Sequence, residues 1–332
     1  TVYYSGHLSD LLGRMRTLGL SGYAIAVALF LYSSANDIGL SLMMASAFIG
    51  FGWGLMYTLA PVVLTRICSA ERRVQIFSLY AVFLMSGFGL SPVFASWMTS
   101  NGHSITAAFQ VIAVLCAISG TLFLLLKGPV NHHAVAEAPN ARSRLSPGSV
   151  WAILQSRAWL PVVMVYLGAS VFAGLNNFQT SIARAEGLNY ADYFLTYTIT
   201  TVICRFLFAG LSGGKSPYRL IGILQTIMCL SALLFLFING NQSTYIACAI
   251  LFGIGYGASY PILAAMAAND AQEDLLPQTL QLFSLTYFIG IFGFPYVAGW
   301  LIVDFSISVL IMVVALLAAI EAAMALVRSA KN

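Results

Sequence analysis

The sequence predicts an all-α protein that crosses a membrane many times. Of its 332 residues, 60% are hydrophobic and only 8% are charged, and the apolar residues gather in long runs. Soluble domains carry about 25% charged residues. The composition therefore excludes a soluble enzyme, a nucleic-acid-binding protein and a disordered chain. Long apolar runs favour helices over a membrane β-barrel, whose strands alternate in polarity at every second residue.

Ten segments are long and apolar enough to span a bilayer, which takes about 20 mostly apolar residues. The predicted spans are residues 17–34, 38–64, 75–98, 104–126, 158–180, 191–211, 218–238, 243–267, 279–302 and 305–327. Most connections are short, but one long polar segment with prolines and arginines predicts a linker between two halves. The predicted parts are residues 1–127, the linker 128–157 and residues 158–332.

The basic residues predict the orientation of these spans. When ten spans alternate, all 15 lysines and arginines except Arg184 and Arg205 fall on one side. Basic loops stay in the cytoplasm. We therefore expect both chain ends and the linker on the cytoplasmic side of a plasma membrane or a bacterial inner membrane.

One motif, G-x-G-aromatic-G-x-x-Y, occurs twice, at Gly50–Tyr57 and at Gly253–Tyr260. The second copy lies six predicted helices after the first, an even number, so both copies have the same orientation. This predicts a parallel repeat of six-helix halves. The 203-residue offset implies an intact protein of twelve helices, of which this sequence lacks the first and most of the second. We expect this form, expressed alone, to be inactive in transport.

The N-terminal residues carry a second motif, Gly6-His7-Leu8-Ser9-Asp10-Leu11-Leu12-Gly13-Arg14, followed by Leu18. It resembles the loop 2–3 signature of the major facilitator superfamily, G-x-L-[SA]-D-x-x-G-R-[RK]-x-x-L, with Met15 as a departure. The resemblance implies the major facilitator fold over the whole chain and transport by alternating access. It also implies that Asp10, with Gly6, Gly13 and Arg14, latches the cytoplasmic gate against the start of helix 11, near Gln278. The alternative is a solvated loop acid beside loop bases.

Aromatic and amide side chains are the candidates for a substrate cavity. Tyr287 and the aromatics of the repeated motif could form its walls, and an amide cluster at the end of helix 7 could bind polar groups, because amides both donate and accept. Packing between helices and an aromatic belt at the membrane surface are the alternatives. The candidates are Trp53, Tyr57, Asn176, Asn177, Gln179, Tyr256, Tyr260 and Tyr287.

Two charged residues lie within predicted spans, where charge is costly and often functional. Arg205 could contact an anionic substrate or a coupling carboxylate, or bond helix-end carbonyls. Glu321 could titrate with a proton, or reach the polar headgroups from two turns inside its helix. The sequence leaves both choices open.

These observations predict a secondary active transporter of small organic molecules, with proton-coupled efflux of a metabolite or drug-like compound favoured. The alternatives are uptake of a small organic acid with Arg205 as the anion contact, and a transport-inactive sensor or scaffold. We expect a small-molecule substrate, protons and the lipid bilayer as partners, no nucleic acid, and a monomer. The five cysteines and four histidines have no metal-binding or disulfide spacing, so no enzymatic site, metal or cofactor is expected.

Overall fold

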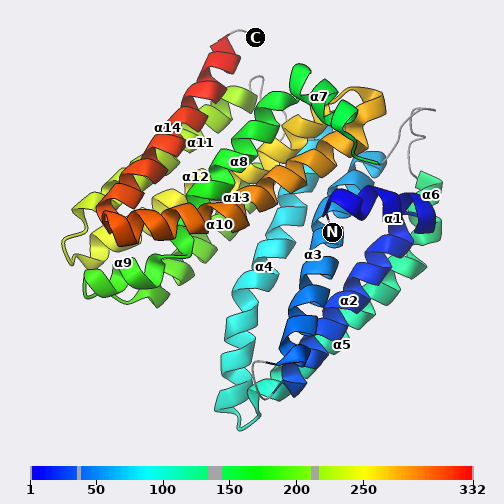
Figure 1. The fold of residues 1–332 in the computed structure, drawn as a ribbon, viewed down its shortest axis with the longest axis horizontal. Coiled ribbons are helices and arrows are strands. Elements are labelled where there is room, and N and C mark those ends of the chain that lie inside the picture. The colour runs from blue at the N-terminus through cyan, green and yellow to red at the C-terminus, as the bar shows by residue number, and fades with distance from the viewer. Residues whose placement is uncertain (1, 36–38, 134–143, 211–216, 331–332) are drawn as a thin grey trace. The chain divides into compact units, whose positions relative to one another are not determined.

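The computed structural model describes residues 2–35, 39–133, 144–210 and 217–330, which form helices and loops without strands (Figure 1). Part of the predicted linker lies outside these ranges. Helices occupy all ten predicted spans, which confirms the all-α fold class. They are α2 (Arg14–Ser34), α3 (Leu40–Ile67), α4 (Arg73–Ser100), α5 (Ile105–Leu125), α8 (Trp159–Asn176), α10 (Tyr190–Gly210), α11 (Pro217–Leu234), α12 (Gln242–Asn269), α13 (Leu276–Asp304) and α14 (Ile307–Ala330).

Shorter helices connect or flank the long ones. They are α1 (Ser5–Leu12), α6 (Lys127–His133), α7 (Pro147–Gln155) and α9 (Gln179–Ala185). Four 3₁₀ turns cover Val2–Tyr4, Ala70–Arg72, Phe235–Phe237 and Glu273–Leu275.

The helices group into two compact units. Unit 1 comprises Thr1–Ser69, Gly87–Ile153 and Ala271–Ser284, and unit 2 comprises Ala70–Ser86, Leu154–Asp270 and Leu285–Asn332. Two helices therefore belong to both units. The first turns of α4 pack in unit 2, among helices from the C-terminal part of the chain, and the first turns of α13 pack in unit 1, among helices from the N-terminal part.

In unit 1, α2 packs against both α3 and α5. Glycines allow these close approaches, because an ideal Cβ at Gly22 would lie 2.8 Å from the Cα of Gly120 on α5. In unit 2, α11 packs against α12 and α14, while α12 also packs against α10 and α8. Its core includes the fully buried Tyr193, Tyr245 and Phe252.

The predicted repeat is visible in a pair of equivalent contacts. An ideal Cβ at Gly52 would lie 2.7 Å from the carbonyl oxygen of Ser21, and one at Gly255 would lie 2.8 Å from that of Leu224. Both residues of the second pair are 203 positions after their counterparts. The helices also begin in register, since α2 and α11 start at Arg14 and Pro217, and α4 and α13 at Arg73 and Leu276. The motif glycines thus hold α3 on α2, and α12 on α11, in the same way.

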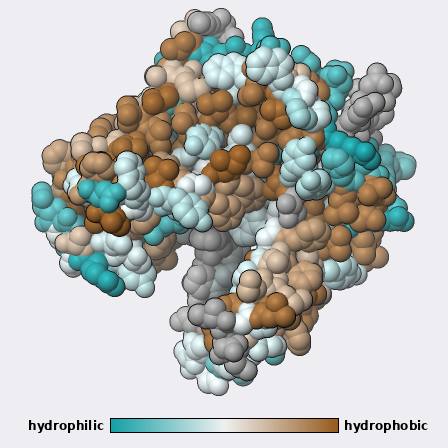
Figure 2. All heavy atoms as spheres, in the orientation of Figure 1, coloured by the Kyte–Doolittle hydropathy of each residue, from teal (hydrophilic) through white to brown (hydrophobic). Residues whose placement is uncertain are grey.

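Eight helices in the described ranges are long and apolar enough to cross a membrane, and α4 and α10 lie on the two remaining predicted spans. On α5, Val114, Leu115, Ile118 and Leu122 each expose half of their surface or more. Figure 2 shows hydrophobic residues along the long helices of each unit, with hydrophilic residues gathered near α9 and near α6. This exposed apolar surface is suited to contact with lipid tails.

Two helices end several residues before their predicted spans do. α11 ends at Leu234 instead of residue 238, and the 3₁₀ turn Phe235–Phe237 follows it. The span 158–180 was expected to continue to residue 180, but α8 ends at Asn176 and α9 begins at Gln179. Asparagine side chains compete with the backbone for hydrogen bonds. Here Asn176 Nδ2 donates to the carbonyl oxygen of Phe172 at 3.1 Å, which accompanies the end of the helix.

The glycine contact in the second motif gives a stability prediction. We expect Gly255→Ala to destabilise the protein by about 1–3 kcal/mol, because the new methyl group would meet backbone atoms of α11. Gly50→Ala is the matched control, since a Cβ there meets nothing within 4 Å and alanine favours helix by about 1 kcal/mol. Thermal unfolding of both variants in detergent measures the difference. Equal melting temperatures would contradict the packing described here.

Candidate functional site

The loop signature forms a tight turn between α1 and α2. α1 ends at Leu12. Gly13 has a φ of 85°, a backbone conformation that residues other than glycine rarely adopt. Thr17 Oγ1 donates to the carbonyl oxygen of Gly13 at 3.0 Å and so secures the first turn of α2. Gly6 and Ser9 are buried on α1, which leaves Asp10 on its exposed side.

Asp10 pairs with a linker residue. Its Oδ2 accepts a hydrogen bond from Arg144 Nε at 3.1 Å, with both side chains partly exposed. The main-chain carbonyl of Arg144 accepts a hydrogen bond from Gln278 Nε2 at 2.7 Å, at the start of α13. Arg144 therefore connects the loop signature to the helix against which the sequence predicted the latch to close.

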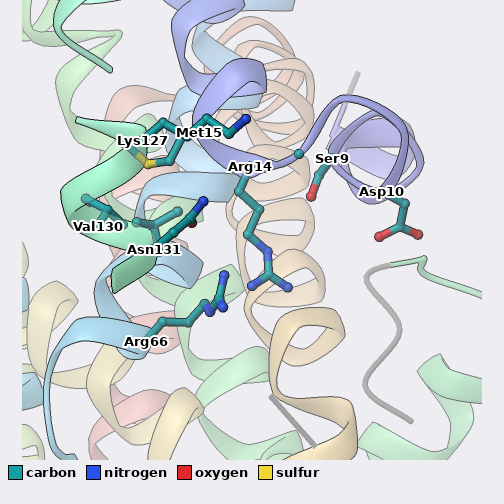
Figure 3. Close-up of a pocket in the computed structure, with 10 residues that line it drawn as sticks. Ser9, Asp10, Arg14, Met15, Arg66, Lys127, Val130 and Asn131 are labelled. Atoms are coloured by element: carbon teal, nitrogen blue, oxygen red, sulfur yellow. The ribbon is translucent and has the colours of Figure 1, made fainter. Parts of the chain in front are cut away.

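A basic cavity of about 250 Å³ lies beside this turn (Figure 3). The figure shows the guanidinium groups of Arg14, from α2, and Arg66, from α3, pointing toward the same space. Lys127 at the start of α6 adds a third cation to the lining. The remaining lining residues are Ser9, Asp10, Gly13, Met15, Val63, Val130 and Asn131.

A second set of polar contacts holds the start of α13. Gln281 is 2% exposed, and its Nε2 donates to the carbonyl oxygens of Val2 at 2.9 Å and Tyr3 at 2.8 Å. Gln278, one turn earlier, is also buried. Sequence reasoning placed the start of helix 11 near Gln278 but missed these glutamines as contacts. The available signal was the presence of two glutamines three residues apart at the start of an apolar helix, where polar side chains often bond a neighbouring segment.

The start of α4 is held in a similar way within unit 2. Arg73 Nη1 donates to the carbonyl oxygen of Ala268 at 3.0 Å and to Asn269 Oδ1 at 2.9 Å. Ala268 lies in the last turn of α12, where helix carbonyls have no partner in their own helix. This contact could not be predicted from the sequence. Arg73 and Asn269 look like ordinary polar residues of two loops, and the carbonyl of Ala268 is a main-chain group.

Arg205 is buried, with 2% of its surface exposed, and it bonds two main-chain carbonyls. Its Nη1 donates to Ala81 of α4 at 2.8 Å and its Nε to Gly257 of α12 at 2.7 Å. The carbonyl of Gly257 would normally accept from the residue four positions on, but that residue is Pro261, which has no N–H. Arg205 therefore supplies the donor that the proline removes.

Three of the predicted aromatic residues lie together in unit 2. The ring centroids of Tyr260 and Tyr287 are 5.3 Å apart. Tyr256 stacks on Phe172 of α8 at 4.7 Å. Tyr260 and Tyr287 thus form one aromatic contact, between α12 and α13, and Tyr256 and Phe172 form another, between α12 and α8.

The first copy of the motif differs in exposure. Trp53 is 42% exposed and Tyr57 is 6% exposed, whereas Tyr256, which corresponds to Trp53, is 5% exposed. Trp53 and Tyr57 belong to unit 1 and the other three tyrosines to unit 2. Their membership of one cavity stays a prediction.

The amide cluster divides between core and surface. Gln179 is fully buried, and its Oε1 accepts from the hydroxyl of Tyr245 at 2.8 Å. Asn176 is buried and Asn177 is exposed. Gln179 Nε2 and Asn176 Oδ1 have no hydrogen-bond partner among the described residues, so each retains capacity for water or a polar ligand.

The Arg205–Pro261 relationship predicts non-additive stability effects. We expect Arg205→Ala to destabilise by about 1–3 kcal/mol, because it leaves the buried Gly257 carbonyl unpaired. Adding Pro261→Ala restores an N–H at that position, so the double variant should recover part of the loss. Thermal unfolding of both single variants and the double variant forms the cycle. Strict additivity would show that Arg205 does not compensate for the proline.

Comparison with known proteins agrees with these observations. The family model described as Major Facilitator Superfamily matches residues 1–295. No curated protein sequence matches the chain.

Several solved structures share the fold. The human organic anion transporter MFSD10 (TETRAN) has a TM-score of 0.79 at 14% identity, over 98% of this chain and 80% of that one. The Escherichia coli fucose:proton symporter FucP has a TM-score of 0.75 at 17% identity, over 99% and 87%. The proton:xylose symporter XylE has a TM-score of 0.67 at 13% identity, over 97% and 81%. Likeness at these identities shows the fold.

The family model covers most of the chain, and the long apolar helices agree with a protein that crosses the membrane repeatedly. Proteins of this family are transporters and not enzymes. The chain belongs to the major facilitator superfamily.

Proposed function

We propose that this protein is a secondary active transporter that moves a small organic molecule by alternating access. Its two six-helix halves, residues 1–127 and 158–332 joined by the linker 128–157, would rock about a central site. The observation that carries the proposal is the pair of shared helices. The first turns of α4 are bonded to helices of the C-terminal half, and those of α13 to the N-terminal half.

These contacts have the composition of a reversible gate. Gln281, Arg73 and Arg205 donate to main-chain carbonyls of the other half, and Gln278 donates to the carbonyl of Arg144 in the linker. All except Arg205 lie at the basic ends of the helices, which the positive-inside rule assigns to the cytoplasm. This supports a gate closed on the cytoplasmic side, with Asp10, Gly13 and Arg14 as part of its latch.

For the substrate, we propose a metabolite or drug-like compound, exported with proton coupling. The partly exposed aromatic pair of Tyr260 and Tyr287, with Tyr256 buried nearby on α12, supports an organic substrate with little charge. The Nε and Nη1 groups of Arg205 both donate to main-chain carbonyls in this conformation, which gives this side chain a structural role. These observations favour a neutral or hydrophobic substrate over an anionic one.

Uptake of a small organic acid is the second candidate. Among the described residues, no carboxylate pairs with Arg205, so its buried charge lacks a counter-ion. An anionic substrate could supply one in another conformation. MFSD10, with which this chain shares a fold, is described as an organic anion transporter.

The first test is of the gate. We expect the combination Arg73→Ala with Gln281→Ala to open the cytoplasmic side more often, by roughly 10-fold or more. A lost hydrogen bond from the glutamine amide is worth about 0.5–1.5 kcal/mol, and one from the charged Arg73 about 1.5–3 kcal/mol. The readout is the labelling rate of Ser284→Cys, a buried position on α13, by an impermeant maleimide in inside-out vesicles. Variants without this cysteine give the background. Gln272→Ala, at an exposed position, is the matched control. Equal labelling rates in the otherwise unchanged protein, the double variant and the control would refute the gate.

The second test is of the substrate class. Ligands that bind only the folded protein raise its melting temperature by mass action. Lipophilic cations, small organic anions and neutral sugars are added to the complete natural chain, to Arg205→Ala and to Tyr260→Ala. We expect hydrophobic compounds to stabilise the wild type and Arg205→Ala equally, and Tyr260→Ala less.

The other outcomes separate the alternatives. Stabilisation by anions that vanishes in Arg205→Ala would replace the export proposal with organic-acid uptake. Stabilisation by no compound of any class would favour a transport-inactive sensor or scaffold. Shifts are compared within each variant, so the lower stability of Arg205→Ala itself does not affect the result.

A further inference from the structure

A carboxyl group that takes part in neither the gate contacts nor the sequence motifs is buried within unit 2. Glu321 lies on α14 and has none of its surface exposed. The sequence left open whether this residue reaches the lipid headgroups. Its side chain instead points between α8 and α11 and does not extend to the surface.

Two helices shape the place of this carboxyl. Gln225 of α11, which is 1% exposed, donates from Nε2 to Glu321 Oε1 at 2.8 Å. On α8, an ideal Cβ at Gly168 would lie 3.1 Å from Oε2 and 3.3 Å from Oε1. A glycine at 168 thus leaves the room that the carboxyl occupies.

The remaining oxygens of the pair are both unsatisfied acceptors. Glu321 Oε2 and Gln225 Oε1 are buried and have no hydrogen-bond partner among the described residues. An ionised carboxylate is an acceptor only, whereas a protonated carboxyl is also a donor. One proton would therefore give this pair the donor that it lacks.

Among the residues that the structure describes, none around Glu321 supplies a compensating positive charge. α8 presents Gly168, and α11 presents Gln225 and then Cys229, whose thiol donates to the carbonyl of Ala315. On α14 the next charged residue is Arg328, whose guanidinium lies over the ring of Tyr218 at 5.8 Å. Burying an ionised carboxylate without a cation is costly, so the neutral acid is the form that suits this site.

We propose that Glu321 and Gln225 form a proton-binding site within the C-terminal half. The proton bonds to a carboxyl oxygen of Glu321, and the amide of Gln225 holds the acid through its N–H. On release the proton passes to water and leaves the carboxylate. The use of this proton in coupled transport rests on the proposed function, whereas its binding does not.

Infrared spectroscopy of the complete natural protein in lipid nanodiscs tests the site without a substrate. At neutral pH we expect the C=O stretch of a protonated carboxyl in the wild type, and its loss in Glu321→Gln. In Gln225→Leu the band should persist at a higher frequency, because its carbonyl loses a hydrogen bond. Asp10→Asn, at an exposed carboxyl, is the matched control and should leave the band unchanged.

Two outcomes would overturn the proposal. A spectrum unchanged by both Glu321→Gln and Gln225→Leu would show that the proton is elsewhere. If Glu321→Gln fails to fold, the frequency shift in Gln225→Leu alone assigns the band. We also expect the wild-type band to disappear reversibly as pH rises, and a band that persists until the protein unfolds would overturn exchange of the proton. Failure of the gate and substrate tests would refute the proposed function but leave this band in place.

Discussion

Lipid tails cannot hydrogen-bond, and this constraint governs every long helix of the protein. Each main-chain N–H and C=O in a span needs a partner within the protein. Pro261 breaks this rule on α12, because it leaves the carbonyl of Gly257 without its helical donor. Arg205 restores the bond from α10 and at the same time donates to Ala81 of α4. One side chain thus repairs a helix and joins it to a helix of the other half.

Close contact between helices follows from the same environment. Lipid is as apolar as leucine, so helices in a membrane associate through tight packing instead of a hydrophobic driving force. Gly52 and Gly255 provide that packing at equivalent places in the two halves. The residues that follow them have diverged, since Trp53 is partly exposed and Tyr256 is stacked in the core. The repeat therefore keeps the glycine contacts between helices, while the aromatic residues beside them differ in their exposure.

The helices could be predicted well from sequence because hydropathy reports directly on a span of fixed length. The parallel repeat could also be predicted, since its glycines mark contacts that recur at a fixed offset. The partners of individual polar side chains could not. Gln281 bonds the carbonyls of Val2 and Tyr3, nearly 280 positions away in the sequence. Every residue has a main-chain carbonyl, so the identity of the accepting residue does not reveal such a bond. Glu321 likewise reads as a residue near a helix end, and only the packing of α8 and α11 shows that it is enclosed.

The chemistry of the gate contacts bears on how easily such a protein can change conformation. Breaking a buried ion pair leaves an uncompensated charge and costs about 3–5 kcal/mol. The bonds at the starts of α13 and α4 instead end on carbonyls, and several of these lie at chain or helix ends where water can replace the donor. Each bond from a glutamine amide is worth about 0.5–1.5 kcal/mol, and each bond from the charged Arg73 about 1.5–3 kcal/mol. A ligand can shift a two-state equilibrium only by its differential affinity for the two states, so a carrier benefits from states separated by a few kcal/mol. In the proposed gate, five such bonds would be enough to favour one state, while the difference would stay within reach of substrate binding or of one proton.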